Sequence, residues 1–142
     1  MGCDIHWHLE VKINGRWEHF ASPDNPRSYA LFARMAGVRN SPLDSIRYVQ
    51  PIDVPRGMVG DPSVVTEIAR HDWGVDAHSE SWLTGEEVDA LCDETEVEGS
   101  QMPNLRRLFG YGFGNGFSLK DAAAGDFPDV VEAFRLVFWF DN

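Results

Sequence analysis

Positive charge is scarce in this chain, and its scarcity excludes one broad class of function. Lysine and arginine together number 12, against 23 aspartates and glutamates in 142 residues, so the formal net charge is −11. A protein this acidic repels the phosphates of duplex nucleic acid and the surface of an acidic membrane. We therefore expect no duplex nucleic-acid partner, although a local group of arginines is still compatible with a small anionic ligand.

Cysteine and long apolar runs are also scarce. The two cysteines, Cys3 and Cys92, are too few for a disulfide framework and fit no zinc-ribbon spacing. No apolar run approaches the roughly 18–20 residues of a membrane-spanning helix, and the charged first segment does not resemble a secretory signal. We expect a soluble, cytoplasmic protein with no membrane partner.

Apolar residues, by contrast, are abundant enough for one folded domain. Hydrophobic side chains make up 43% of the chain and aromatic ones 12%. A chain of this length and composition can bury a substantial core and falls within the usual size of one domain. We expect a single domain over residues 1–142.

The first segment of the chain, residues 3–13, alternates strictly between apolar and polar side chains. Period-two alternation predicts a β-strand with one buried face and one polar face. The apolar set is Cys3, Ile5, Trp7, Leu9, Val11 and Ile13, and the polar set is Asp4, His6, His8, Glu10 and Lys12. Two imidazoles between carboxylates favour a functional site on the polar face, with an ordinary half-exposed face as the alternative.

A second and a last strand complete the expected sheet. Asn14-Gly15 predicts a type I′ hairpin turn, because both central residues of that turn need positive φ, so residues 16–20 should return antiparallel. Residues 134–140 are apolar on both parities apart from Arg135, the pattern of a central strand. We expect an α+β fold, in which a small, mainly antiparallel sheet packs with short helices and long loops.

Three short helices are expected between these strands. The first covers residues 29–36, the second begins after a cap at Ser63 and runs to about residue 70, and the third begins at the capping box of Thr84 and Glu87. In the second helix the expected buried stripe is Val64, Val65 and Ile68.

Two kinds of chemistry suit the polar row of the first strand. His6 and His8 point the same way from a strand, a chelating arrangement that, with His78, suits a divalent zinc, manganese or iron ion. Without a metal, His6 oriented by Asp4 or Glu10 could act as an acid–base group near neutral pH. A serine nucleophile beside His78 is disfavoured, because the chain has no G-x-S-x-G elbow.

Loop arginines and a glycine-rich segment are further candidates for ligand binding. Arg27, Arg39 and Arg56 lie in expected loops, where guanidinium groups could converge on phosphate oxygens or could bond loop carbonyls instead. Residues 109–117 alternate glycine with aromatic side chains, which indicates either a loop pinned to the core or a lid that stacks on a planar ligand.

Several motifs together resemble a family of small uncharacterised bacteriophage and prophage proteins. They are MGCDIH at the start, RSYALFARMAGVRN at 27–40, PRG at 55–57, HSESWLT at 78–84 and RLVFWFDN at the end. The resemblance extends over the whole chain and implies a phage protein of the host cytoplasm, but no particular activity. The family pattern falls on Asp4, His6, Arg27, Tyr29, Arg39, Arg56, Asp61, His78, Ser79, Ser81 and Trp82, whereas His8 and His71 lie outside it.

These observations predict a pocket for a small phosphorylated, nucleotide-like ligand. The first hypothesis is a hydrolase such as a phosphodiesterase, with Asp4, His6 and His78 as catalytic groups and His6, His8 and His78 as the ligands of any metal. The expected ligand-binding residues are Arg27, Tyr29, Arg39, Arg56, Ser79, Ser81 and Trp82. The alternatives are a non-catalytic binder that sequesters a host nucleotide signal in anti-phage defence and an interaction protein that blocks a host factor. A homo-oligomer is compatible with all three.

Overall fold

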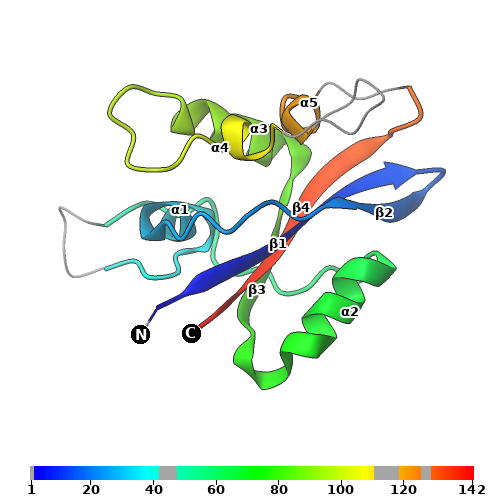
Figure 1. Cartoon of the computed structure of the whole chain (residues 1–142), viewed down its shortest axis with the longest axis horizontal. Helices are drawn as coiled ribbons and strands as arrows, with labels where there is room; N and C mark the ends of the chain where they lie inside the picture. The colour runs from blue at the N-terminus through cyan, green and yellow to red at the C-terminus, as the bar shows by residue number, and fades with distance from the viewer. Residues whose placement is uncertain (1, 42–47, 111–118, 126–128) are drawn as a thin grey trace.

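Four antiparallel strands form one sheet at the centre of the molecule (Figure 1). The computed structural model describes residues 2–41, 48–110, 119–125 and 129–142. The strands are β1 (Asp4–Ile13), β2 (Arg16–Ala21), β3 (His78–Thr84) and β4 (Ala133–Asp141), in the order β2-β1-β4-β3. With short helices around it, this sheet confirms the predicted α+β fold class.

The N-terminal hairpin has the predicted turn. Asn14 and Gly15 have φ values of +52° and +74°, as a type I′ turn requires, and Ile13 pairs with Arg16 across it. A register shift between Leu9 and Glu10 makes β2 irregular toward its end. The prediction of a hairpin over these residues is confirmed.

The last strand is central, as its two-sided apolar pattern predicts. β4 lies between β1 and β3, and its pairing with β1 runs from Asp4↔Asp141 to Lys12↔Ala133. Trp139 and Phe140, which follow one another on opposite faces of the sheet, are both fully buried. The strand is therefore covered on both faces.

β3 is a strand that the sequence pattern did not predict. A register shift separates its pairs His78↔Phe140 and Ser81↔Phe138. Ser79, inside the shift, has a φ of +55°, a left-handed conformation that is uncommon outside glycine. Because the irregularity interrupts the alternation of buried and exposed side chains, residues 78–84 do not show the period-two signature of a strand.

The hydrophobic core lies between the sheet and four helices on one of its faces. These helices are α1 (Tyr29–Ala36), α3 (Gly85–Thr95), α4 (Leu105–Leu108) and α5 (Leu119–Ala123), of which the first two match the predicted elements. Gly37 ends α1 with a φ of +72°, and Thr84 and Glu87 make both hydrogen bonds of the capping box. Cys3, just before β1, and the apolar residues Ile5, Trp7 and Leu9 of β1 belong to the same buried cluster.

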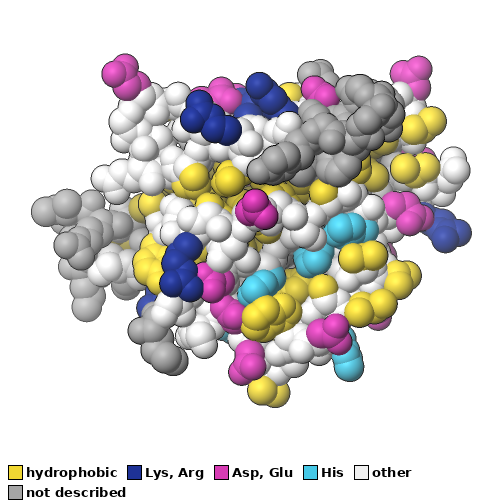
Figure 2. Space-filling view, viewed as in Figure 1, with side chains coloured by type: hydrophobic (Ala, Val, Ile, Leu, Met, Phe, Trp, Pro, Cys, Tyr) yellow, Lys and Arg dark blue, Asp and Glu magenta, His cyan; other side chains and the backbone are white. Residues whose placement is uncertain are grey.

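The remaining helix, α2 (Val64–Trp73), covers the polar row of β1 and is followed by the 3₁₀ turn η1 (Gly74–Asp76). The predicted buried stripe of α2 was wrong, because Val64, Val65 and Ile68 are 70%, 50% and 56% exposed. Thr66 is buried instead, and its hydroxyl donates to Glu10 at 2.7 Å. The helix turns its polar side inward because the strand beneath it is polar, and hydrophobic side chains gather on the surface over α2 (Figure 2).

Two further expectations concern the glycine-rich segment and membranes. Residues 111–117 of the predicted lid lie outside the described part of the chain, while Phe109 is buried against Trp7 at a ring-centroid distance of 5.5 Å. Among the helices that the structure describes, none is long and apolar enough to cross a membrane.

Candidate functional site

Asp4, the first residue of the polar row, is engaged by a loop arginine. Arg27 donates from Nε to Asp4 Oδ1 at 2.7 Å and from Nη2 to Oδ2 at 2.9 Å, and Asn25 donates to Oδ1 at 2.7 Å. These bonds, first from Arg27 and then from Asn25, lower the pKa of Asp4 to about 2. Arg27 and Asp4 thus form a bidentate pair with each other, which stabilises the start of β1.

His6, the second residue of the row, lies between two tryptophans. Its ring centroid is 4.0 Å from that of Trp73 on α2 and 6.3 Å from that of Trp139 on β4. His6 Nε2 is 3.4 Å from Asp141 Oδ2, but this buried nitrogen has no partner in hydrogen-bonding geometry. The carboxylate beside His6 is therefore that of Asp141, whereas the sequence predicted Asp4.

His8, the third member, forms a compact cluster with His19 of β2 and with Ser22, which directly follows β2. Its Nδ1 is 3.2 Å from Nε2 of His19 and 2.9 Å from Oγ of Ser22, and these last two atoms are 3.1 Å apart. The His8 ring stacks on Trp139 at 5.1 Å. Burial, and then the charge of His19, lowers the pKa of His8 to about 4, and burial lowers that of His19 as well.

Glu10, the fourth member, is fully buried in an ion-pair network. It accepts from Arg135 Nε at 2.8 Å, from the Ser63 amide at 2.8 Å and from the Thr66 hydroxyl. Burial opposes ionisation of this carboxyl, but the hydrogen bonds outweigh burial and lower its pKa. Arg135 also donates to Asp61 at 2.9 Å, so this network ties the sheet to the segment before α2.

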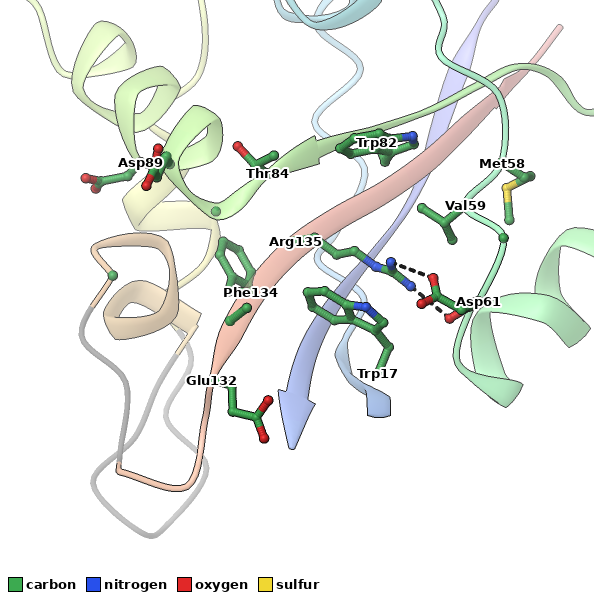
Figure 3. Close-up of a pocket in the computed structure, with 15 residues that line it drawn as sticks. Trp17, Met58, Val59, Asp61, Trp82, Thr84, Asp89, Glu132, Phe134 and Arg135 are labelled. Atoms are coloured by element: carbon green, nitrogen blue, oxygen red, sulfur yellow. Dashed lines mark hydrogen bonds and ion pairs between the residues drawn. The ribbon is translucent and has the colours of Figure 1, made fainter. Parts of the chain in front are cut away.

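A cavity of about 860 Å³ opens beside Arg135, at the end of the sheet where β3 leads into α3 (Figure 3). Three aromatic side chains contribute to its lining, Trp17 of β2, Trp82 of β3 and Phe134 of β4. Four carboxylates line it as well: Asp61, Glu86, Asp89 and Glu132. Of the fifteen described residues that line the cavity, Arg135 is the only basic one and none is a histidine.

Both tryptophans of the cavity are held by guanidinium groups. The Arg135 guanidinium carbon lies 4.0 Å from the ring centroid of Trp17, and that of Arg56 lies 4.8 Å from the ring centroid of Trp82. Such cation–π contacts are worth about 0.5–2 kcal/mol each. The two indoles are therefore held in place by the protein's own side chains.

His78 does not share a site with His6. Its ring stacks on Phe140 at 6.3 Å, whereas the His6 ring contacts Trp139, and these two neighbours on β4 point to opposite faces of the sheet. His78 Nδ1 is 2.9 Å from the Ser79 hydroxyl, and Nε2 is 2.9 Å from Asn142 Oδ1. The structure does not bring together the predicted catalytic residues Asp4, His6 and His78.

Arg56 and the serine before Trp82 have roles within the fold. Arg56 donates to both oxygens of Glu87 at 2.7 Å and to Asp53 at 3.1 Å, and its amide donates to the Ser81 hydroxyl at 3.0 Å. The bonds to Glu87, followed by that to Asp53, raise the pKa of Arg56 against the opposing effect of burial. This network joins the loop before α2 to β3 and α3.

Arg39 and Tyr29 lie in a different neighbourhood, near the start of β1. The Arg39 guanidinium carbon is 5.5 Å from the ring centroid of Tyr29, and the Tyr29 hydroxyl accepts from the Cys3 amide at 3.1 Å. Neither Arg39 nor Arg56 is among the fifteen residues that line the cavity. The expected convergence of the two arginines on one pocket is therefore not observed for this cavity.

The histidines proposed as metal ligands are also separated. The rings of His6 and His8 both lie against Trp139, but His6 otherwise contacts Trp73 and His8 contacts His19 and Ser22, while His78 lies across the sheet. Within the part of the chain that the structure describes, no three histidine, cysteine, aspartate or glutamate side chains are grouped closely enough to hold a metal ion.

Of the seven residues expected to bind a ligand, only Trp82 is among the described residues that line the cavity. Sequence reasoning missed the rest of this lining and part of the histidine cluster. Trp17, Glu132 and the acids of α3 carry no local motif, and they meet only because β2, β4 and α3 begin near one another. His19 was more accessible to prediction, because the Asn14-Gly15 turn sets the hairpin register and places His19 opposite Glu10.

No family model, no curated protein and no solved structure matches this chain in three separate comparisons.

Proposed function

We propose that this protein binds a small planar ligand in the cavity between Trp17, Trp82 and Phe134. The observation that carries the proposal is the cavity itself, with two indoles already fixed by Arg135 and Arg56. Its volume of about 860 Å³ lies in the range of small-molecule sites, about 300–1,000 Å³. Aromatic faces fixed before binding favour a ring that stacks on them, because little conformational entropy is lost.

The charges around the cavity narrow the chemistry of the ligand. Four carboxylates face it, and Arg135 already bonds Glu10 and Asp61. Carboxylates accept from ring and amino N–H groups but repel phosphate oxygens. We therefore propose a neutral or cationic nitrogen heterocycle of nucleoside size, which corresponds to the base and sugar of the nucleotide-like ligand expected from the sequence.

Binding without chemistry is the role that this cavity supports. The acid–base groups of the hydrolase hypothesis, Asp4, His6 and His78, are absent from its described lining. For a phage protein of the resembled family, such a binder would act by sequestering a small host molecule.

The proposal is tested by calorimetric titration with adenosine, guanosine and cytidine and with their 5′-monophosphates. We expect at least one nucleoside to bind at one site, and its monophosphate to bind more weakly because of the carboxylates. Glu86→Gln removes one of these charges at an exposed position and should narrow the difference between nucleoside and monophosphate.

A pair of tryptophan variants locates the site. Trp82→Leu removes a stacking face and should weaken nucleoside binding about tenfold or more. Trp73→Leu is the matched control. Trp73 is on α2, where its ring contacts His6 of β1, and it does not line the cavity. If no nucleoside binds, or if both variants weaken binding equally, the proposal is wrong.

A further inference from the structure

The cluster of His8, His19 and Ser22 is not used by the cavity and has its own geometry. Three side-chain atoms, His8 Nδ1, His19 Nε2 and Ser22 Oγ, form a nearly equilateral triangle with sides of 3.2, 2.9 and 3.1 Å. Hydrogen bonds alone can explain such distances. The same triangle also has the size of one face of a metal coordination polyhedron.

Zinc coordination gives the scale for this comparison. Imidazole nitrogens bind Zn²⁺ at about 2.0–2.1 Å, so two ligand atoms of a tetrahedral site are about 3.3 Å apart. The sides of the observed triangle are shorter by only a few tenths of an ångström. A metal ion would therefore reach all three atoms from just above their plane, after a small outward movement of the ligands.

The three residues are placed by the backbone before any ion arrives. His8 is on β1, its ring rests on Trp139 at 5.1 Å, and it is only 8% exposed. His19 is on the adjacent strand β2, with its ring 5.3 Å from that of His8. Ser22 directly follows β2. Binding would cost little side-chain entropy, because both imidazoles are already held in position.

The surroundings of the cluster leave a path for an ion. Glu10, the strand partner of His19, lies beside the cluster and is itself paired with Arg135. A second cavity of about 460 Å³, between β2 and the start of α2, is lined in part by His19 and gives an ion and its water a route of entry.

We propose that His8, His19 and Ser22 form a binding site for a divalent transition-metal ion of the zinc class, with water completing its coordination. Two imidazoles favour zinc, copper or nickel over magnesium or calcium, which prefer oxygen ligands. This site differs from the set His6, His8 and His78, with which it shares only His8.

The test is calorimetric titration of Zn²⁺ into the full chain after treatment with a chelator and its removal. Wild type should bind one Zn²⁺ per chain. His19→Ala should weaken binding by at least about tenfold, and Ser22→Ala by less than that. His71→Ala is the matched control, because the His71 side chain is 90% exposed and lies on α2, and it should leave the affinity unchanged.

Nuclear magnetic resonance of the imidazoles gives a readout that needs no variant. On addition of Zn²⁺ to wild type, the signals of His8 and His19 should shift first, ahead of those of His6, His71 and His78. If wild type shows no saturable binding, if His19→Ala and wild type bind equally, or if other histidines respond first, the cluster is a hydrogen-bonded network and the proposal is overturned.

Discussion

The two faces of the sheet are both buried, yet they are built from opposite kinds of side chain. On the core face, the apolar residues of β1 pack against α1, α3, α4 and α5. On the other face, α2 covers histidines, a buried glutamate and an arginine. The core face is stabilised by non-directional burial, and the α2 face by hydrogen bonds that need particular partners.

This difference bears on where the molecule can bind a ligand. Apolar packing needs only matching volumes, whereas buried polar groups destabilise the fold unless each finds a partner. The polar face carries the histidine cluster, and at the end of the sheet its residues Trp17 and Arg135 line the cavity together with residues of α3. A face that keeps its polar groups at this energetic cost offers directional groups that a ligand can bind.

The largest effect should come from the core face. Phe32→Ala removes a fully buried ring that contacts Phe140 at 5.1 Å and leaves a cavity, so the free energy of unfolding should fall by about 3–5 kcal/mol. Denaturant unfolding measures the change. Val75→Ala, at a fully exposed side chain, should have almost no effect, and a similar loss in both variants would contradict the assignment of the core.

On the α2 face, Glu10→Gln should destabilise almost as strongly, by about 3 kcal/mol, because Arg135 loses its buried counter-charge. Glu18→Gln, at an exposed position on β2, serves as the control. The double variant Glu10→Leu/Arg135→Met should recover part of the loss, since it leaves no unpaired buried charge, although the Ser63 amide and the Thr66 hydroxyl lose their acceptor. A double variant no more stable than Glu10→Gln would mean that the polar network is required for folding.

Acid should weaken the ion pair of Glu87 and Arg56, which joins the loop before α2 to β3 and α3. Arg56 lowers the pKa of Glu87 to about 2 in the folded protein, against an ordinary value of 4.5. The pair's contribution is therefore complete above about pH 4.5 and is lost as the pH falls toward 2, at a cost of about 1–3 kcal/mol. Thermal unfolding from pH 6 to pH 2 should show a shallower acid loss in Glu87→Gln, and an unchanged slope would contradict the prediction.

The smallest effect is expected on the outward side of α2. Ile68→Ser should change the free energy of unfolding by less than about 0.5 kcal/mol, because this side chain is more than half exposed. Thr66→Val, on the inward side of the same helix, should cost more, since Glu10 loses a hydrogen bond. If Ile68→Ser instead cost more than Thr66→Val, the apolar stripe that includes Ile68 would be the buried side of α2.

Elements with a local signal were predictable from the sequence alone. Four such elements occur in the structure where the sequence predicts them. They are the first strand, the turn at Asn14-Gly15, the end of α1 at Gly37 and the capping box at Thr84. Each depends on backbone geometry or hydrogen bonds within a few residues, so neighbours in the sequence suffice to determine it.

Tertiary structure alone decided which polar groups meet. Arg27, Arg56 and Arg135 could each have faced a ligand, but the fold brings an acid to each, from 23, 31 and 125 residues away. The orientation of α2 and the separation of His6 from His78 likewise depend on strand order. An ionic or polar contact forms with whichever partner the folded chain brings within a few ångström. Because that partner is distant in the sequence, the residues next to an arginine or histidine do not indicate which partner it will have.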